Sequence, residues 1–480
     1  MIGKDKLDLY RFLGTLARGE DYPPKDGPYQ DYRYFQPASL ERVRGFWKRT
    51  LGLKGAPENR ILYLHWPFCP SQCRYCFCSM AVPRSSRQML RYADRLKAEM
   101  DCFSDLFERS EFSAVYIGGG TPTFMPDAAL EGLLRHVRDR FKVRGDAEFY
   151  MEASPATLSE GKMASLRRYG VNRVTLGVQS RDKAVLARAN RKGQDARVVE
   201  AAWGRLAASE GLVRDIDLML GVEGQGRASF LKDLLWSIRR KPDVIHINSF
   251  DPRGQTLFSR GGARVPDSHW AEVESALRAA ERLLESSGYR VTEYDPGRRD
   301  RTRAEKILSD DPFELHSILA FGLHAKGHAF GSAWYQHEPI TAKALDSDRL
   351  PRFTFLASSP AEEARAYVVR SLCLHERLCL GELRRLFGKR LKDLPDLRRR
   401  LLELEECGKV EIGSEEVRLL AVNPVERLIW LKHLCRGAVL EAMKKVHGKE
   451  YREFLRDRSA PARLAEKARA RTFHRVYYRS

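Results

Sequence analysis

The chain has 480 residues and a mass of 55.0 kDa, which suits two or three domains with a buried core. With 43% hydrophobic and 10% aromatic residues, it is too apolar for a disordered or collagen-like protein. No apolar run approaches the roughly 18 residues of a membrane span. The charged opening over residues 1–6 is unlike a secretory signal.

The formal net charge of +20 comes from 84 Lys and Arg against 64 Asp and Glu. Such a balance favours acidic partners, which include nucleic acid, anionic lipid and polycarboxylate substrates. The positive charge is spread along the chain and concentrates only over residues 452–480. We interpret that end as a solvated basic helix and tail, with a nucleic-acid arm as the alternative. No alternation of aromatic and basic residues marks a groove for a nucleic-acid strand.

The cysteines point to a reducing compartment. Four of the nine fall within ten residues, at Cys69, Cys73, Cys76 and Cys78. An odd total with one tight cluster is typical of metal ligation and not of a disulfide framework. We therefore expect a cytoplasmic protein.

Residues 1–55 are expected to form an N-terminal arm. A short helix is predicted over residues 7–18, and a second over residues 39–51. The proline-rich stretch between them, residues 22–28, has the composition of a loop because proline fixes φ and removes a donor.

Residues 56–295 alternate between β-rich runs and helical patterns. The expected strands cover residues 61–65, 115–117, 148–151, 173–176, 216–220 and 244–248. The helices expected between them cover residues 87–107, 127–141, 161–169, 183–189, 196–210 and 228–240. This alternation predicts βαβ units in a parallel sheet. Six units fit an α/β fold with a partial (β/α)6 barrel of the TIM type, whose site would lie at the carboxyl ends of the strands. A doubly wound open sheet is the competing arrangement.

The regular pattern weakens after residue 260. An amphipathic helix is expected over residues 270–288 and a strand over residues 290–293. Residues 296–360 are expected to be a connecting segment with a glycine-punctuated loop over residues 321–331.

Residues 361–480 are expected to form a mostly helical C-terminal domain with a basic tail. Its predicted elements are helices over residues 362–372, 380–387 and 394–407, then strands over residues 410–412 and 418–420. Helices followed by a small hairpin resemble a winged-helix module.

Cys69, Cys73 and Cys76 form a C-x3-C-x2-C group just after the first expected strand. Three thiolates from one loop can hold three corners of a cubane iron–sulfur cluster and leave the fourth iron open to a chelating ligand. A zinc knuckle is the alternative, but it needs four ligands and usually two separated pairs. The spacing favours iron and sulfur.

The sequence resembles the HemN-like group of radical S-adenosylmethionine (SAM) enzymes over residues 63–420. That group includes oxygen-independent coproporphyrinogen III oxidases, HemW-type heme chaperones and class C radical SAM methyltransferases. Five motifs in order carry the resemblance: Tyr63-x-His65-x-Pro67-Phe68-Cys69, Gly118-Gly119-Gly120-Thr121-Pro122, Glu152-x-x-Pro155, Gly170-Val171-Asn172-Arg173-x-x-x-Gly177-Val178-Gln179 and Asp217-Leu218-Met219-x-Gly221.

The resemblance implies a [4Fe-4S] cluster on Cys69, Cys73 and Cys76, whose free iron chelates SAM and whose reduction yields a 5′-deoxyadenosyl radical. The positions that match those holding this first SAM are Tyr63, Gly119 and Glu152. The positions that match those holding a second SAM are Tyr75, Gly120, Thr121, Gln179, Arg191 and Asp217.

The residue types suit these roles. Adjacent glycines let the backbone approach a ligand closely. Glu152 and Asp217 follow expected strands, where a carboxylate can take an ammonium group or ribose hydroxyls. Arg191 can grip a ligand carboxylate bidentately, and Tyr75 can stack on an adenine. Taken alone, each of these residues is typical of a turn, a helix cap or a surface side chain. Only their joint order along the chain favours a functional site.

Cys78 and Tyr75 are the candidate catalytic residues. A fourth cysteine two positions after the third is what the coproporphyrinogen oxidases of this group show, whereas the chaperone type commonly has Phe there. Cys78 then handles a proton or hydrogen atom near the substrate; the alternative is a small residue that packs well.

Other residues point away from the oxidase pattern. Residues 249–251 depart from the oxidase pattern, and the next segment, residues 252–256, looks more like the chaperone and methyltransferase members. His324 and His328 fall in the glycine-punctuated loop, where they would either face the substrate or a heme iron or form ordinary hydrogen bonds. His246 alternates with apolar neighbours and is interpreted as structural.

The leading hypothesis is transfer of a methyl or methylene group to a carbon of a conjugated substrate, using two SAM molecules. The first alternative is oxidative decarboxylation of porphyrinogen propionates, which Cys78 and the basic charge favour. The second is a heme chaperone. The expected partners are a small molecule such as a tetrapyrrole and a reductase such as flavodoxin or ferredoxin.

Overall fold

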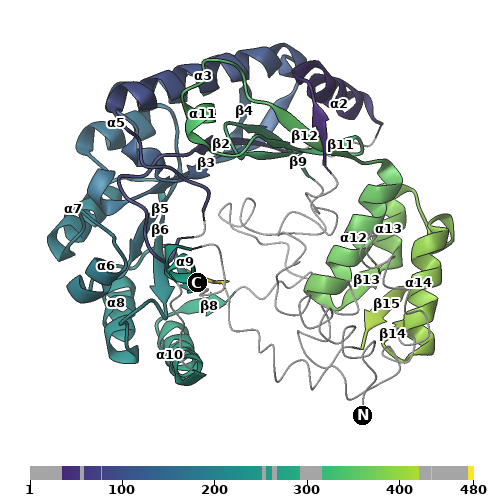
Figure 1. Ribbon diagram of the computed structural model, residues 1–480. Helices are drawn as coiled ribbons and strands as arrows, with labels where there is room; N and C mark the ends of the chain where they lie inside the picture. The colour runs from purple at the N-terminus through teal and green to yellow at the C-terminus, as the bar shows by residue number, and fades with distance from the viewer. Residues whose placement is uncertain are drawn as a thin grey trace.

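The computed structural model describes residues 35–54, 59–76, 78–250, 256–261, 267–291, 316–420, 434 and 474–479. These residues form one large sheet covered by helices and a smaller helical module beside it (Figure 1). The helix expected over residues 7–18 lies outside the described residues, as do residues 296–315 of the expected connecting segment.

Six parallel strands form the centre of the fold. They are β2 (Asn59–Trp66), β3 (Glu111–Gly119), β4 (Lys142–Ala153), β5 (Arg173–Gln179), β6 (Val213–Leu220) and β7 (Val244–Ser249). Each pairs in parallel with the next one in the chain. The six strands curve into an arc with helices on its convex side (Figure 1). The partial barrel predicted from the sequence is therefore confirmed, because a doubly wound sheet would reverse its strand order.

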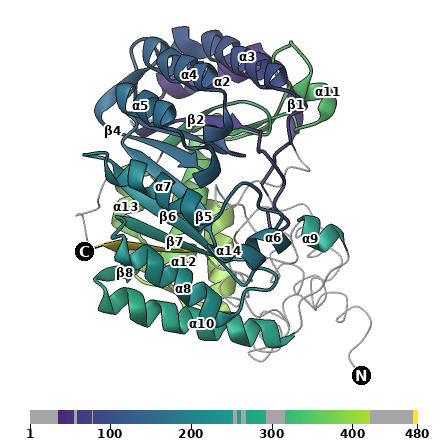
Figure 2. The same cartoon turned by 90° about the vertical axis from the view of Figure 1, so that its left-hand side faces the viewer.

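Helices follow the strands at the predicted places. They are α3 (Ser86–Ser104), α4 (Asp127–Arg140), α5 (Glu160–Arg168), α6 (Lys183–Arg188), α7 (Ala196–Ala207), α8 (Arg227–Arg239) and α10 (Asp267–Ser286). Side-chain oxygens of Ser85, Ser159, Asp182 and Asp195 accept backbone N–H bonds at four helix starts. Figure 2 shows α8 and α10 side by side below the sheet.

Residues 316–357, part of the expected connecting segment, extend the large sheet. The strands are β9 (His316–Phe321), β10 (Lys326–Ala329), β11 (Ala333–His337) and β12 (Phe353–Ala357). Strand β9 pairs in parallel with β2, and the other three follow as antiparallel neighbours. On the far side of β12, β1 (Gln36–Ala38) forms the edge, and α2 (Leu40–Gly52) follows it.

The glycine-punctuated loop expected over residues 321–331 is corrected to a turn between β9 and β10. Gly322 has φ of 98°, which suits the turn. Gly327 lies within β10, where an added Cβ would be 2.0 Å from the ring of Tyr335 on β11. Glycine at position 327 therefore makes room for the aromatic ring on the neighbouring strand. The glycine content of this segment suggests a loop instead.

The chain end also joins the sheet. Strand β16 (His474–Arg479) pairs antiparallel with β7 and with β8 (Tyr289–Val291). These six residues of the expected basic tail are thus a strand and not a solvated helix. The described chain also contains two one-turn helices, α9 (Leu257–Arg260) after β7 and α11 (Ala342–Leu345) between β11 and β12.

The C-terminal module has the order of a winged helix. Its elements are α12 (Pro360–His375), β13 (Arg377–Cys379), α13 (Leu380–Phe387), α14 (Pro395–Glu406), β14 (Val410–Ile412) and β15 (Glu416–Leu419). The three strands form a separate sheet in the order β13-β15-β14. This arrangement agrees with the expected helices and hairpin.

A buried contact joins this module to the large sheet. Nε2 of His328 on β10 lies 2.9 Å from Oε1 of Glu363 on α12, and the imidazole stacks on Trp334 at 3.6 Å between centroids. Both ionisable side chains are 4% exposed. His328 therefore has a structural role, and the hypothesis that it faces a substrate is wrong.

A buried ionic cluster joins the neighbouring strands β4, β5, β6 and β7. Arg173 contacts Glu148 at 2.9 Å and Asp215 at 2.7 Å, and His246 lies 3.4 Å from Asp215. All four side chains are at most 5% exposed. The interpretation of His246 as structural agrees with this placement.

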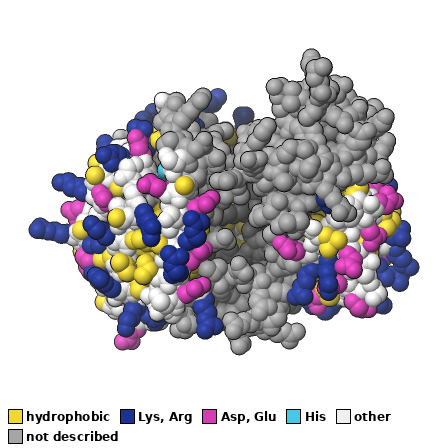
Figure 3. Space-filling view, turned by 90° about the horizontal axis from the view of Figure 1, so that it is seen from below, with side chains coloured by type: hydrophobic (Ala, Val, Ile, Leu, Met, Phe, Trp, Pro, Cys, Tyr) yellow, Lys and Arg dark blue, Asp and Glu magenta, His cyan; other side chains and the backbone are white. Residues whose placement is uncertain are grey.

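The described surface in Figure 3 carries charged, other polar and scattered hydrophobic side chains. Lys and Arg side chains are spread over it and intermixed with Asp and Glu (Figure 3). No helix in the described ranges combines the length and the apolarity needed to cross a bilayer.

Candidate active site

The cysteine loop begins where β2 ends. The N–H of Cys69 donates to the carbonyl of Ala81 over 3.0 Å, and the N–H of Ala81 donates to the carbonyl of Pro67 over 2.7 Å. Phe68, between them, is fully buried. The two sides of the loop are thus tied at its base, which fixes the position of Cys69.

The far side of the loop is held by the segment after α6. Nδ2 of Asn190 donates to the carbonyl of Gln72 over 2.9 Å, and Oγ of Ser71 donates to the carbonyl of Asn190 over 3.2 Å. The N–H of Arg74 donates to the carbonyl of Ala189 over 2.9 Å. Cys73 is therefore fastened beside the segment that leads from β5 to α7.

The glycine triplet after β3 packs directly on the start of the cysteine loop. The N–H of Gly120 donates to the carbonyl of Trp66 over 2.7 Å. Gly119 has φ of 113°, and a Cβ there would lie 2.7 Å from the ring of His65. A Cβ on Gly120 would lie 2.8 Å from the carbonyl oxygen of Phe68. In these contacts the glycines serve close approach of two backbone segments.

Thr121 completes this contact. Its N–H donates to the carbonyl of Phe68 over 2.9 Å, and its hydroxyl lies 3.1 Å from Sγ of Cys69. One residue of the glycine-rich loop thus touches a cysteine side chain directly.

The three thiols fit an iron–sulfur cluster by their chemistry. Burial raises the pKa of Cys69 to about 12, while a hydrogen bond with Cys78 lowers that of Cys76 to about 7. In the described part of the chain, no three His, Cys, Asp or Glu side chains gather closely enough for a single metal ion. In a cubane cluster each ligated iron takes one thiolate. The soft thiol ligands therefore surround the whole cluster and do not converge on a single metal ion.

Glu152 lies at the carboxyl end of β4 in a buried pocket. Its Oε2 accepts the N–H of Gly119 over 3.3 Å, and its Oε1 accepts the hydroxyl of Tyr116. Burial and nearby Asp217 raise the pKa of Glu152 to about 7, against these hydrogen bonds. Among the described residues, no Lys or Arg pairs with this carboxyl. A desolvated carboxyl without a Lys or Arg partner is suited to bind a cationic ligand.

Tyr63 lies next to this carboxyl. Its hydroxyl is 2.8 Å from Nδ1 of His65, and its ring meets the ring of Tyr116 edge-on at 5.2 Å between centroids. Nε2 of His65 lies 3.1 Å from the carbonyl of Ser79, so Nε2 carries the proton and Nδ1 accepts from Tyr63. The structure therefore brings Tyr63, Gly119 and Glu152 together, as the sequence predicts.

A second carboxyl site lies at the ends of β5, β6 and β7. Asp217 accepts Nε2 of Gln179 at 2.7 Å and Nδ2 of Asn248 at 2.5 Å. Burial raises the pKa of Asp217. Gln179 has φ of 65°, a conformation that non-glycine residues seldom adopt outside functional sites. Its Oε1 is buried and has no hydrogen-bond partner among the described residues, which suits a donor on a ligand.

Arg191 lies between the cysteine loop and β5. Each of its three guanidinium nitrogens contacts a group of the protein. Its Nη1 lies 3.8 Å from Sγ of Cys73 and 3.3 Å from the hydroxyl of Tyr75, and its Nε donates to Gln194 over 2.9 Å. Its Nη2 donates to the carbonyl of Gly177. In this structure Arg191 therefore bridges the cysteine loop and β5, and its grip on a ligand carboxylate stays a prediction.

Tyr75 leaves the cysteine loop and packs into a small apolar cluster. The other members are Val185, Met219, Val222, Phe250 and Phe258. Burial raises the pKa of the Tyr75 phenol, so it is neutral and can accept from Arg191. Its stacking on an adenine stays a prediction.

Cys78 is exposed, and a hydrogen bond with Cys76 raises the pKa of its thiol. Glu152 raises that pKa further, so the thiol and this carboxyl share one region. His324 occupies the turn after β9 with φ of 64° and lies close enough to lower the pKa of His65. Neither residue is assigned a role by these contacts.

Sequence reasoning missed Tyr116, Asn248 and His65 as site residues. His65 and Asn248 are polar positions near the ends of otherwise apolar strands, which is a usable signal. Tyr116 has no such signal, because aromatic residues are common in strands.

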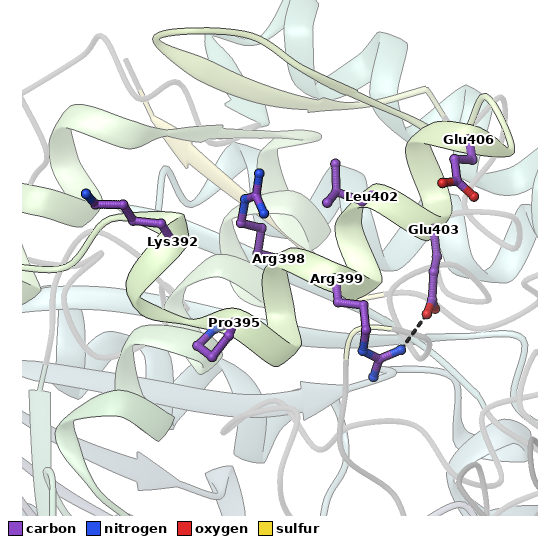
Figure 4. Close-up of a pocket in the computed structure, with 7 residues that line it drawn as sticks. All are labelled: Lys392, Pro395, Arg398, Arg399, Leu402, Glu403 and Glu406. Atoms are coloured by element: carbon purple, nitrogen blue, oxygen red, sulfur yellow. Dashed lines mark hydrogen bonds and ion pairs between the residues drawn. The ribbon is translucent and has the colours of Figure 1, made fainter.

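A separate surface hollow lies on α14, away from the cysteine loop (Figure 4). Its lining mixes charges: Arg399 pairs with Glu403, while Lys392 and Glu406 lie at opposite ends. No thiol or glycine-rich loop lines it. The barrel edge is therefore the candidate active site.

Comparisons with known proteins agree with this geometry. The family profile described as "Radical SAM superfamily" matches residues 63–236. An oxygen-independent coproporphyrinogen III oxidase from Bradyrhizobium diazoefficiens is 27% identical over 458 residues, which cover 91% of this chain and 98% of the relative. The heme chaperone HemW from Escherichia coli is 31% identical over 55% of this chain and 69% of the relative.

Among solved structures, coproporphyrinogen III oxidase (HemN) from Escherichia coli superposes with a TM-score of 0.68 at 21% identity. The match covers 85% of this chain and 96% of that one, and it shows a shared fold.

The partial barrel with a three-cysteine loop at its carboxyl edge defines a radical SAM enzyme. Such enzymes use a [4Fe-4S] cluster and SAM. Within that class, this chain belongs to the HemN-like radical SAM family.

Proposed function

We propose that the chain oxidatively decarboxylates propionate side chains of a coproporphyrinogen-type tetrapyrrole. The observation that carries this proposal is the extent of the match to the Bradyrhizobium oxidase, which spans 98% of that relative, against 69% of HemW. Cys78, the fourth cysteine of the loop, and the net charge of +20, which suits a polycarboxylate, support it. The proposal takes the place of methyl or methylene transfer as the leading hypothesis.

Cys69, Cys73 and Cys76 would hold the cluster, since their loop is tied at its base and again beside Asn190. When bound, the cluster and SAM supply a one-electron reductive cleavage that makes a carbon radical able to abstract hydrogen. A reductase of the flavodoxin or ferredoxin class would deliver that electron.

Tyr63 and Glu152 would bind the ammonium group of the first SAM. Because Tyr63 donates its proton to His65, its oxygen stays an acceptor toward a cation. Glu152 has its two oxygens oriented by Tyr116 and Gly119. Binding a cation there would restore the charged carboxylate, whose pKa burial has raised.

The pocket of Gln179, Asp217 and Asn248 would hold a second SAM. Two side-chain amides orient the Asp217 carboxylate, which is suited to accept ribose hydroxyls. The buried Oε1 of Gln179 supplies a further acceptor. Gly120 and Thr121 border the same edge through the backbone of Trp66 and Phe68.

The reaction balances for each propionate. The carbon next to the ring would lose one hydrogen atom, the bond to the carboxylate carbon would break, and carbon dioxide would leave. A vinyl group forms, and one electron passes to an external one-electron acceptor. The chain must exclude water and oxygen during these steps, since both quench or divert radicals.

The test is product analysis after anaerobic reconstitution with iron and sulfide, using SAM, dithionite and coproporphyrinogen III. Deoxyadenosine, carbon dioxide and a vinyl-bearing porphyrinogen are expected together. Deoxyadenosine with comparable S-adenosylhomocysteine and an unchanged carboxyl count would overturn the proposal in favour of methyl transfer. Tight heme uptake without any turnover would overturn it in favour of a chaperone.

Two cysteine variants separate chemistry from folding. Cys69→Ala should lose the brown cluster chromophore and all SAM cleavage. Cys102→Ala is the matched control, because Cys102 lies on α3 and its thiol donates to the carbonyl of Ala98 in the same helix over 3.3 Å. Retained colour and cleavage in Cys69→Ala would contradict the proposed ligand set.

A further inference from the structure

Arg191 is the cationic side chain that touches a cysteine of the loop. Its Nη1 lies 3.8 Å from Sγ of Cys73, within reach of an N–H···S hydrogen bond. Cys73, Tyr75 and Arg191 also interact electrostatically, and their attraction keeps the pKa of Arg191 above its usual range although burial alone would lower it. The guanidinium is therefore charged in place.

The guanidinium is also fixed in orientation. Nε donates to Oε1 of Gln194 over 2.9 Å, and Nη2 donates to the carbonyl of Gly177 on β5. Gln194 is itself held, because its Nε2 donates to the carbonyls of Val178 and Ser180 at 2.6 and 3.0 Å. A planar fork held at Nε and Nη2 keeps Nη1 pointed at the cysteine loop.

We propose that Arg191 raises the reduction potential of the iron–sulfur cluster by donating a hydrogen bond to the Cys73 thiolate. The inference rests on the proposed function, since it requires Cys73 to be a cluster ligand. Hydrogen bonds and positive charge at a cluster thiolate stabilise the reduced, more negative state. The residue is a positioning residue that acts through Cys73.

The same guanidinium borders the second carboxyl site. Gly177, which accepts its Nη2, lies two residues before Gln179 and pairs in register with Asp217. Arg191 thus joins the cluster loop to the wall of the Gln179 and Asp217 pocket. One side chain, that of Arg191, therefore contacts both the loop that would hold the cluster and the strand that borders that pocket.

The test is the midpoint potential of the reconstituted cluster without SAM, followed by electron paramagnetic resonance during a redox titration. Arg191→Gln removes the charge and the fork, and Arg191→Lys keeps the charge alone. Arg188→Gln is the matched control, because Arg188 is an exposed cation three residues earlier in the same segment. Iron and sulfide content must equal that of the unaltered chain.

We expect a lower potential in Arg191→Gln, a smaller decrease in Arg191→Lys and no change in Arg188→Gln. Equal potentials in the unaltered chain and both Arg191 variants would overturn the inference. So would an equal decrease in Arg188→Gln, because net charge alone would then explain the effect. Absence of any cluster in the unaltered chain would count against the proposed function, and so the two failures are distinguishable.

Discussion

Tyr116 on β3 donates its hydroxyl proton to Glu152 on β4, and this contact orients the carboxyl at the edge of the barrel. The same carboxyl accepts the N–H of Gly119. The glycine-rich loop, the strand end and the buried acid therefore form one unit. Burial holds the pKa of Glu152 near 7, where small changes in surroundings switch its charge.

Glu152→Gln should stabilise the cluster-free chain at alkaline pH. Because burial raises the pKa of Glu152 from 4.5 to about 7, the native state binds more protons than the unfolded state in that window. Stability from this group is therefore present at low pH and lost as the pH rises toward 7. Thermal unfolding at about pH 8 should show a melting temperature a few degrees higher in the variant. Glu160→Gln, on the exposed start of α5, should change nothing, and an unchanged Glu152→Gln profile contradicts the assignment.

His65→Phe should reduce the acid sensitivity of the chain. Burial lowers the pKa of His65 to about 4, so its contribution to stability is present above about pH 6.5 and is lost as the pH falls toward 4. The variant also leaves the Ser79 carbonyl without its donor, at a cost of about 1–3 kcal/mol. Urea unfolding at about pH 7.5 and pH 5 measures both effects. Tyr63→Phe should keep the pH dependence, and the same loss in both variants is the result that rules this account out.

Arg173→Ala should be strongly destabilising. The substitution leaves Glu148 and Asp215 as buried carboxyls without their cation, which costs about 3–5 kcal/mol. Urea unfolding measures the change in free energy. Arg144→Ala breaks a partly exposed pair with Asp146 and should cost about 1 kcal/mol or less. Equal costs would show that burial does not decide the strength of the Arg173 cluster.

Glu363→Ala should loosen the C-terminal module from the sheet. Burial alone would raise the pKa of Glu363, but His328 and two further hydrogen-bond donors, Ser358 and the N–H of Gly331, hold it below its usual range. The contact therefore stabilises the native state at pH values above the usual pKa of a glutamate. This stabilisation is lost as the pH falls below it. We expect a loss of about 3 kcal/mol and faster proteolysis between β12 and α12. Glu382→Ala, in an exposed pair with Arg385, is the control, and equal cleavage rates in the two variants would disprove the role of Glu363.

The central fold was predictable because its determinants are local. Hydrophobic runs separated by amphipathic helices specify βαβ units, and capping residues such as Ser85 and Asp182 mark where helices begin. The cysteine spacing likewise places three thiols in one loop without reference to the rest of the chain. Glu152 and Asp217 were named from the family motifs, and the rule that parallel strands present their carboxyl ends at one edge agrees with their positions.

The tertiary structure decided what depends on distant partners. Strands β9 and β16 join the sheet beside β2 and β7, which lie far away in the chain, and nothing in a local period reports such pairing. The contacts of Arg191 with Cys73, Tyr75 and Gly177 likewise exist only in the folded chain, and no local pattern predicts them. Composition and spacing thus determined the strand order, the helices and the kind of chemistry. Long-range packing decided which polar groups are satisfied by the protein and which, like Oε1 of Gln179, are left for a ligand.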